Sequence, residues 1–227
     1  MTNTKIPFLD LIARSPLIFS NVITRVWRRL LEIPSRGFPT GVRKDSFDAQ
    51  HGTNTSGIVW LTNLRSENFA RGIRYEPCPP RTCEAAIEQA EIDPTQFYFI
   101  DVGCGKGRPL IIASRYGFQQ LIGIEYSAAL CQVAERNLAI CKIENAKIIH
   151  TDATQFTFPR ANTFAMFFHP FQDDILAVVL DRLRVATEGH KLVIAYTGDG
   201  KDLVARQAWL EPLRDPPNMR LFKRKPY

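Results

Sequence analysis

The chain has 227 residues, of which 45% are hydrophobic and 23% are charged, a composition that predicts one folded domain and argues against intrinsic disorder. No apolar run approaches the roughly 18 residues that span a membrane. The apolar residues near the N-terminus are interrupted by charges and a proline, unlike those of a secretory signal. The net charge of +6 is concentrated in residues 1–50 and 220–227. The middle of the chain is therefore not basic, which argues against a nucleic-acid groove across it.

The cysteines give no sign of a metal site. There are five of them, an odd number, and their spacing fits no zinc-binding pattern. Cys104 lies inside a glycine-rich loop, and Cys131 lies in a stretch with helical spacing. We therefore expect reduced thiols, no bound metal and a cytoplasmic protein.

Residues 1–94 have an irregular pattern with many proline, glycine and asparagine residues. Within them, residues 21–32 predict a basic amphipathic helix, because apolar residues recur at helical spacing and three arginines take much of the remaining face. Such a helix packs on its own domain or lies on an anionic membrane surface, and we favour packing. Residues 84–90 predict a further helix that opens at Arg81 or Thr82.

From residue 95 onward, strands and helices alternate with short connections, which indicates an α/β domain with a parallel sheet. The predicted strands cover residues 97–100, 121–124, 146–150, 163–168 and 191–196. The predicted helices cover residues 109–116, 128–140 and 173–184. The remaining residues predict a short helix and two more strands, near 209–213 and 219–225. We therefore divide the chain into an extension (1–94) and a seven-stranded α/β domain (95–227).

The junction between the first strand and the next helix reads Asp101-Val102-Gly103-Cys104-Gly105-Lys106-Gly107. At such a junction a ligand lies beyond the carboxyl end of the strand, and glycines let the backbone approach it. Loops that bind a pyrophosphate usually read GxGxxG. This loop instead reads GxGxG and follows a carboxylate, which would repel phosphates. Asp101 suits a ligand with an ammonium and a sulfonium group, and S-adenosylmethionine (SAM) carries both.

Two more acidic residues follow strands. Glu125 ends the second predicted strand, where a carboxylate can accept hydrogen bonds from both ribose hydroxyls of either SAM or NAD. Asp152 follows the third, where it can accept from an adenine amino group. Each could alternatively be a solvated loop carboxylate. The three acids together, each after its own strand, favour a nucleoside ligand more strongly than any one of them.

At this point residues 95–196 resemble the class I SAM-dependent methyltransferases. The resemblance implies a Rossmann-like, doubly wound sheet of seven strands, mostly parallel with an antiparallel last strand. It implies that Asp101, Gly103 and Gly105 surround the methionine part of SAM. The residues expected near the cofactor are Tyr75, Asp101, Gly103, Cys104, Gly105, Gly107, Glu125, Tyr126, Asp152, Ala153 and His169.

The N-terminal half carries a narrower resemblance. Residues 47–57 (FDAQHGTNTSG) and 75–77 (YEP) look like those of a group of small, mostly uncharacterised methyltransferases. The Tyr-x-Pro segment and the GKGR letters at 105–108 are also similar, more faintly, to certain protein-lysine methyltransferases. In those, the segment before the first strand closes over the cofactor. Tyr75 is therefore expected either to cover SAM or to pack inside the protein.

The fourth predicted strand ends in Phe167-Phe168-His169-Pro170-Phe171, where this family places the methyl acceptor. Enzymes that methylate base amines often carry Asn or Asp, then Pro-Pro and an aromatic residue. His169 and the single proline depart from that pattern and argue against base-amine methylation. His169 could be a general base, a wall of the pocket, or a residue outside the site. Together with Pro170 and Phe171 it is our candidate for the catalytic region.

The sequence therefore predicts a SAM-dependent methyltransferase acting on a nitrogen or oxygen nucleophile, with a protein lysine as one candidate. A protein or small-molecule acceptor is favoured over nucleic acid. Two other readings stay open at this stage. One is a SAM-binding module without catalytic activity. The other is a nicotinamide-dependent oxidoreductase, which the GxGxG spacing and Asp101 disfavour.

Overall fold

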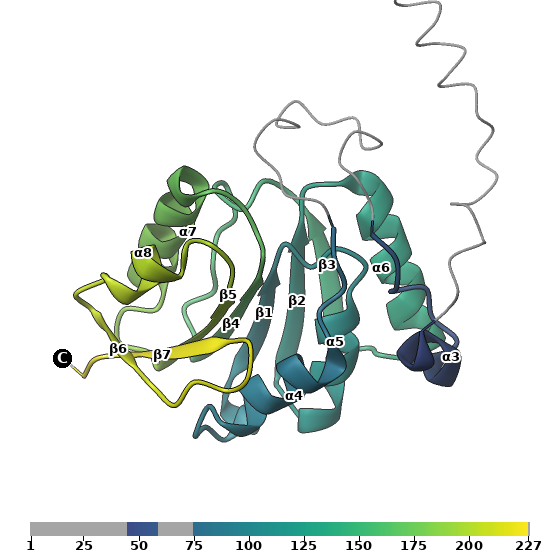
Figure 1. Ribbon diagram of the computed structural model, residues 1–227, viewed down its shortest axis with the longest axis horizontal. Coiled ribbons are helices and arrows are strands. Elements are labelled where there is room, and N and C mark those ends of the chain that lie inside the picture. The colour runs from purple at the N-terminus through teal and green to yellow at the C-terminus, as the bar shows by residue number, and fades with distance from the viewer. Residues whose placement is uncertain (1–44, 59–74, 227) are drawn as a thin grey trace, which may run out of the picture. The chain divides into compact units, whose positions relative to one another are not determined.

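We analysed a computed structural model of the chain, which describes residues 45–58 and 75–226. The helix predicted over residues 21–32 lies outside these residues. No helix in the described part is long and apolar enough to cross a membrane. Figure 1 shows the described residues as a twisted sheet with helices on both faces.

The sheet has seven strands in the order β3-β2-β1-β4-β5-β7-β6. These strands are β1 (Tyr98–Val102), β2 (Gln120–Glu125), β3 (Ala146–His150), β4 (Thr163–Phe168), β5 (Leu192–Thr197), β6 (Leu210–Pro212) and β7 (Arg220–Arg224). The first five pair in parallel. Strand β7 runs antiparallel to both of its neighbours, β5 and β6. The predicted mostly parallel sheet with an antiparallel last strand is confirmed.

Helices follow the strands as the alternating pattern predicts. They are α3 (Ser46–His51), α4 (Pro80–Glu88), α5 (Arg108–Ala113), α6 (Ala128–Ile140), α7 (Asp173–Ala186) and α8 (Lys201–Ala205). Helix α4 begins earlier than expected, because Pro80 fits a first helical turn, where no N–H is needed. The helix predicted over 109–116 ends as α5 at Ala113 and continues as a short 3-10 turn, Ser114–Tyr116.

The core lies on both faces of the sheet, as expected for parallel strands covered by helices. Neighbouring residues of β1 point to opposite sides. Phe99 packs in a cluster with side chains of α4, α5 and α6, whereas Ile100 packs in a second cluster with side chains of α7 and α8. Both residues are fully buried.

This topology produces a crevice at one edge of the sheet. From β1 the chain crosses to β2 on one side, while β4 pairs with the other side of β1. The connections after β1 and β4 therefore leave in opposite directions, and ligands of doubly wound sheets bind where this happens. The carboxyl ends of these strands lie at the upper side of Figure 1. All predicted site residues that follow a strand belong to this edge.

Candidate active site

The loop after β1 is folded against β2. The backbone N–H groups of Gly103 and Cys104 both donate to the carbonyl oxygen of Ile124, at 2.9 Å each. The Cys104 side chain is buried and lies against Gly123 of β2, where an added Cβ would fall 2.7 Å from its sulfur. Only the backbone of this part of the loop is therefore available to a ligand at the sheet edge.

Asp101, in β1, has a buried carboxyl with an unsatisfied oxygen. The residue is 2% exposed, and its Oδ2 has no hydrogen-bond partner among the described residues. Burial, followed by the nearby charge of Glu125, raises the pKa of Asp101 to about 8. A buried polar atom without a partner is costly. This carboxyl therefore suits a ligand that brings a hydrogen-bond donor or a positive charge.

Glu125, at the end of β2, is tied to the same loop. Its two carboxyl oxygens accept from backbone N–H groups, one from Gly105 at 3.0 Å and the other from Ser127 at 2.7 Å. Burial raises the pKa of Glu125, and these hydrogen bonds oppose that rise. A carboxylate oxygen has more than one acceptor position. Glu125 can therefore orient the glycine loop and still accept from a hydroxyl of a ligand.

The residues predicted near an adenine follow β3 and β2 at the same edge. The Asp152 carboxyl accepts from the backbone N–H and the hydroxyl of Thr154, at 2.8 and 2.7 Å, in a local turn. Ala153 is 9% exposed and packs at the end of the core. Tyr126 is 37% exposed, and its carbonyl oxygen lies 2.9 Å from Nε2 of His150. The side chains here are partly open to solvent, unlike those around Asp101.

Tyr75 covers the glycine loop. An added Cβ at Gly105 would fall 2.2 Å from the Tyr75 ring. The Tyr75 hydroxyl donates to the carbonyl oxygen of Thr55 at 2.5 Å, and burial raises its pKa well above the usual value. The cavity left between Tyr75, Asp101 and the loop measures about 20 Å³, about the space of one water molecule. A larger ligand beside Gly105 requires the Tyr75 ring to move.

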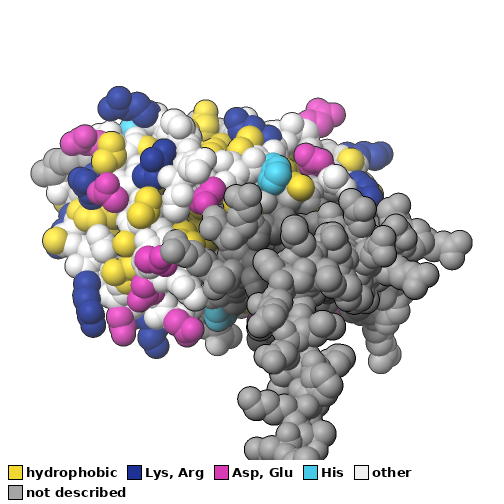
Figure 2. Space-filling view, turned by 90° about the horizontal axis from the view of Figure 1, so that it is seen from above, with side chains coloured by type: hydrophobic (Ala, Val, Ile, Leu, Met, Phe, Trp, Pro, Cys, Tyr) yellow, Lys and Arg dark blue, Asp and Glu magenta, His cyan; other side chains and the backbone are white. Residues whose placement is uncertain are grey.

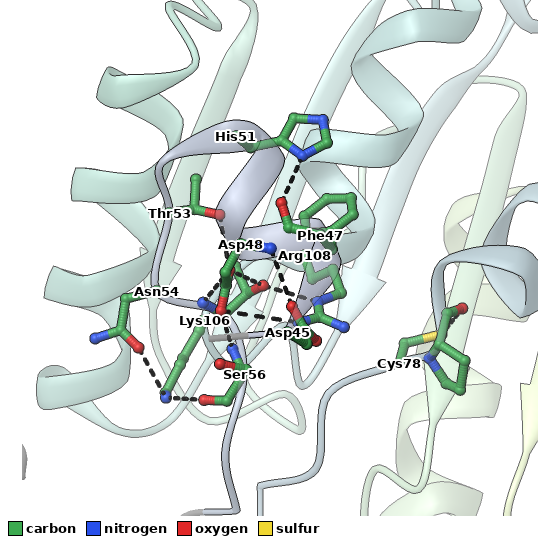
Figure 3. Close-up of polar contacts among 12 residues, drawn as sticks. Asp45, Phe47, Asp48, His51, Thr53, Asn54, Ser56, Cys78, Lys106 and Arg108 are labelled. Atoms are coloured by element: carbon green, nitrogen blue, oxygen red, sulfur yellow. Dashed lines mark hydrogen bonds and ion pairs between the residues drawn. The ribbon is translucent and has the colours of Figure 1, made fainter. Parts of the chain in front are cut away.

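A buried polar network holds the segment 45–58 next to this loop (Figure 3). Its centre is Asp48, which is fully buried. The Asp48 carboxyl accepts from the Thr53 hydroxyl, from the N–H and hydroxyl of Thr55, and from the N–H of Ser56, at 2.7 Å each. These bonds outweigh the burial and hold the pKa of Asp48 far below its usual value. Asp48 is therefore ionised.

Two cations from the glycine loop complete the buried polar network. Arg108, 3% exposed, donates through Nε to the Thr55 hydroxyl at 2.7 Å and pairs with Asp45 at 2.5 Å. Its guanidinium also lies 4.9 Å from the centre of the Phe47 ring. Lys106 donates through Nζ to the carbonyl oxygen of Ser56 at 2.6 Å. Figure 3 shows both side chains reaching from the loop towards the segment around Asp48.

Sequence reasoning singled out the letters of this network without finding their roles. The FDAQHGTNTSG and GKGR motifs were assigned to a family resemblance, and neither was expected to contact the other. The hydrogen bonds span 53 residues between Arg108 and Thr55, so no local periodicity indicates them. The only signal was the run of small hydroxyl and glycine residues after an aspartate, which is typical of a turn that satisfies a buried carboxylate.

His169 follows β4 in a conformation unusual for a residue with a side chain. Its φ is 46°, in the left-handed region, where such residues are often found at functional sites. Its backbone N–H donates to the carbonyl oxygen of Thr197 at 2.7 Å. Pro170 comes next and lies close to the glycine loop, with its Cα 3.8 Å from where a Cβ on Gly103 would be. The loops after β1 and β4 therefore meet.

A second, larger hollow lies beside His169. It measures about 270 Å³ and lies between residues 169–173, which follow β4, and residues 198–200, which follow β5, with Tyr196 also in its wall. We call it the β4–β5 pocket. The structure thus brings His169, Pro170 and Phe171 together in one pocket wall. Among the described residues, no group of three or more His, Cys, Asp or Glu side chains is arranged to hold a metal ion.

Comparisons with known proteins agree with this geometry. Residues 99–188 match the family model described as "Methyltransferase domain". No curated protein matches the chain. The fold is similar to that of a putative methyltransferase, yhhF, from Escherichia coli, with a TM-score of 0.54 and 19% identity over 75% of this chain and 100% of that one.

Two further solved structures have the same fold. A putative methyltransferase from Pseudomonas syringae has a TM-score of 0.53 and 13% identity, and the alignment covers 63% of this chain and 96% of that one. A ribosomal protein L11 methylase from Lactobacillus delbrueckii subsp. bulgaricus has a TM-score of 0.50 and 17% identity, covering 64% and 77%. The resemblance to class I methyltransferases and the Rossmann-like fold that it implied are confirmed.

Proposed function

We propose that this chain, whose residues 99–188 belong to the methyltransferase-domain family, binds SAM at the carboxyl edge of its sheet and transfers the methyl group to a nitrogen or oxygen nucleophile. The observation that carries the proposal is the buried Asp101 carboxyl with its unpartnered Oδ2. SAM presents an ammonium and a sulfonium, and either would satisfy that oxygen. The family match independently supports the same cofactor.

The neighbouring residues fit the rest of the molecule. Glu125 has acceptor positions left for ribose hydroxyls while it holds the Gly105 N–H. Asp152, Ala153 and Tyr126 border the more open region where an adenine would lie. Gly103, Gly105 and Gly107 keep the loop free of side chains on the side of the ligand. Tyr75 would leave its place on Gly105 and cover the bound cofactor.

The residues of the site have a limited chemical task. SAM supplies an activated methyl group on a positively charged sulfur. The protein has to align the acceptor atom with that carbon and to exclude water. Pro170 contacts the glycine loop, and it would therefore fix the position of His169 and Phe171 relative to the methyl group. We assign these three residues to the acceptor side of the site, with His169 placed to orient the acceptor or to take its proton.

We favour a protein lysine as the acceptor. The Tyr-x-Pro and GKGR motifs support this choice through their similarity to protein-lysine methyltransferases. The surface supports a protein or small molecule over nucleic acid. Figure 2 looks onto the carboxyl edge, and on its coloured part Lys and Arg side chains are interspersed with acidic and hydrophobic ones rather than forming one basic stripe. The five cysteines, all free, favour the cytoplasm as its location.

Titration calorimetry of the full chain with SAM and, separately, with NAD tests the cofactor. We expect SAM to bind and NAD not to bind, because the buried Asp101 would face the pyrophosphate. The conservative variant Asp101→Asn keeps the shape and removes the charge, and should bind SAM at least tenfold more weakly. Binding of NAD by the wild-type chain, or unchanged SAM affinity in the variant, would contradict the placement of the cofactor.

A further inference from the structure

The β4–β5 pocket has a charge that restricts what it can hold, and this inference rests on the proposed function. Through Pro170 the pocket adjoins the glycine loop, since the Cα of Pro170 is 3.8 Å from a Cβ built on Gly103. A group in the pocket would therefore lie next to the methyl group of a bound SAM. The choice of acceptor is made here.

The only charged residues that line the pocket, His169 aside, are Asp173 and Asp199. Asp173 is the first residue of α7, and Asp199 lies in the turn before α8. They come from two different loops and meet across one hollow. Neither carboxylate is engaged in a hydrogen bond or an ion pair with another described residue. Both are exposed and therefore reachable from solvent.

Tyr196 places a neutral hydroxyl between these acids. The residue is 1% exposed, and burial together with the charges of Asp173 and Asp199 raises the pKa of Tyr196 to about 12. Its oxygen accepts from the N–H of Gly200. An added Cβ at Gly200 would fall 2.6 Å from that oxygen and 2.9 Å from Oδ1 of Asp173. The glycine therefore keeps this corner of the pocket open.

We infer that the β4–β5 pocket takes a primary amine, and that Asp173 and Asp199 are the residues that select it. Two carboxylates without a lysine or arginine in the lining attract an ammonium ion and repel phosphates and carboxylates. They therefore disfavour methylation of carboxyl oxygens and entry of a nucleic-acid strand. The volume of about 270 Å³ fits a side chain with an amino end.

The reaction then proceeds with a simple balance. The amine arrives as an ammonium ion and gives one proton to water at the open mouth of the pocket. Its nitrogen lone pair forms the bond to the methyl carbon as the carbon–sulfur bond breaks, and that electron pair stays on sulfur. The products are a methylated ammonium ion and the neutral sulfide, S-adenosylhomocysteine. No further reactant is needed.

The test uses the full chain with SAM carrying a tritiated methyl group, and a cell lysate divided into protein, nucleic acid and small molecules. Methyl esters release volatile methanol in mild base, whereas N-methyl groups do not. We expect base-stable label that, after acid hydrolysis, elutes with N-methylated amine standards. Asp173→Asn and Asp199→Asn should each lower incorporation at least tenfold through a higher KM for the acceptor, with SAM affinity within twofold of wild type. Asp199→Glu should restore activity.

Asp202→Asn is the matched control, since Asp202 is an exposed acid of α8 outside the pocket, and it should behave as wild type. Label that is base-labile, label in nucleic acid, or full activity of both asparagine variants would overturn the amine inference and leave the proposed function standing. The absence of any transfer by a chain that binds SAM would also overturn it. Failure of the wild-type chain to bind SAM would overturn the proposed function as well.

Discussion

The ring of Tyr75 rests on Gly105 so closely that a methyl group in place of the glycine hydrogen would lie 2.2 Å from a ring carbon. The same ring is fixed at its far end by the hydrogen bond to the Thr55 carbonyl. The glycine loop of this family is generally thought of as making room for a ligand. Here it also makes room for a tyrosine of the protein itself, so Gly105 has to satisfy two different neighbours.

Gly105→Ala should destabilise the protein by about 1–3 kcal/mol, because the methyl group overlaps the Tyr75 ring and because the φ of 54° is unfavourable for alanine. Urea unfolding followed by fluorescence measures this. In a Tyr75→Ala background the overlap is gone, so the same Gly105→Ala change should cost less. Equal losses in both backgrounds would mean that the ring is not seated on the glycine in solution.

Stability of the free protein should fall as the pH rises, through Asp101. The pKa of this carboxyl is raised from 3.8 to about 8, so between these values the folded state binds a proton that the unfolded state has lost. Its contribution is fully present below about pH 4 and is lost as the pH approaches 8. The slope for one proton is about 1.4 kcal/mol per pH unit at most. Urea midpoints from pH 5 to 8 measure it, and Asp101→Asn should flatten the curve. A wild-type curve parallel to that of the variant would show that Asp101 ionises normally.

The affinity for SAM should rise with pH over the same window. A cation beside Asp101 favours the ionised form of the carboxyl, so binding below pH 8 releases a proton. Calorimetry in two buffers with different ionisation enthalpies would reveal that proton. Asp101→Asn should bind weakly and with little change between pH 6 and 8. Proton uptake on binding, in place of release, would rule out a neutral Asp101 in the free protein.

Asp48→Ala should destabilise the protein by about 3–5 kcal/mol, because it leaves the buried Arg108 and several buried donors without their acceptor. Asp93→Ala provides the comparison. Asp93 also accepts from the N–H and hydroxyl of a threonine, Thr95, at 3.1 and 2.7 Å, but in a solvent-exposed turn. Its loss should be far smaller. Chemical unfolding of both variants decides this, and similar losses would show that burial adds nothing to the Asp48 turn.

His169→Ala should lower turnover by about tenfold or more while SAM affinity changes less than twofold, since the residue lies on the acceptor side of the loop. His169→Gly is a useful partner variant. Glycine relaxes the φ of 46°, so it should be at least as stable as the alanine variant and equally inactive. Equal losses of turnover and of SAM affinity would move His169 out of the acceptor site.

Most of the fold could be predicted from local patterns. The run of aromatic and β-branched residues in β1, the GxGxG loop and the helix after it are close in sequence, and their order fixes the topology. The start of α4 at Pro80 was missed because helix-forming residues follow only later. Such errors concern element ends, which are decided by capping rather than by periodicity.

The site was predicted less completely. Its strand-end residues could be found because parallel strands place their carboxyl ends at one edge. The contact between Arg108 and Thr55, the seating of Tyr75 on Gly105 and the meeting of Asp173 with Asp199 join residues from different loops. No spacing rule connects such positions, because loop paths are set by packing against the finished sheet.

The polar contacts around Asp48 bear on where this protein can be cut. A shortened chain starting at residue 95 would retain every strand of the sheet and the whole stretch matched by the methyltransferase family. It would nevertheless strand Lys106 and Arg108, whose partners Ser56, Thr55 and Asp45 would be gone. Two desolvated cations would face nothing at the very loop that has to hold a ligand. The smallest working unit of this protein therefore extends well upstream of its catalytic sheet.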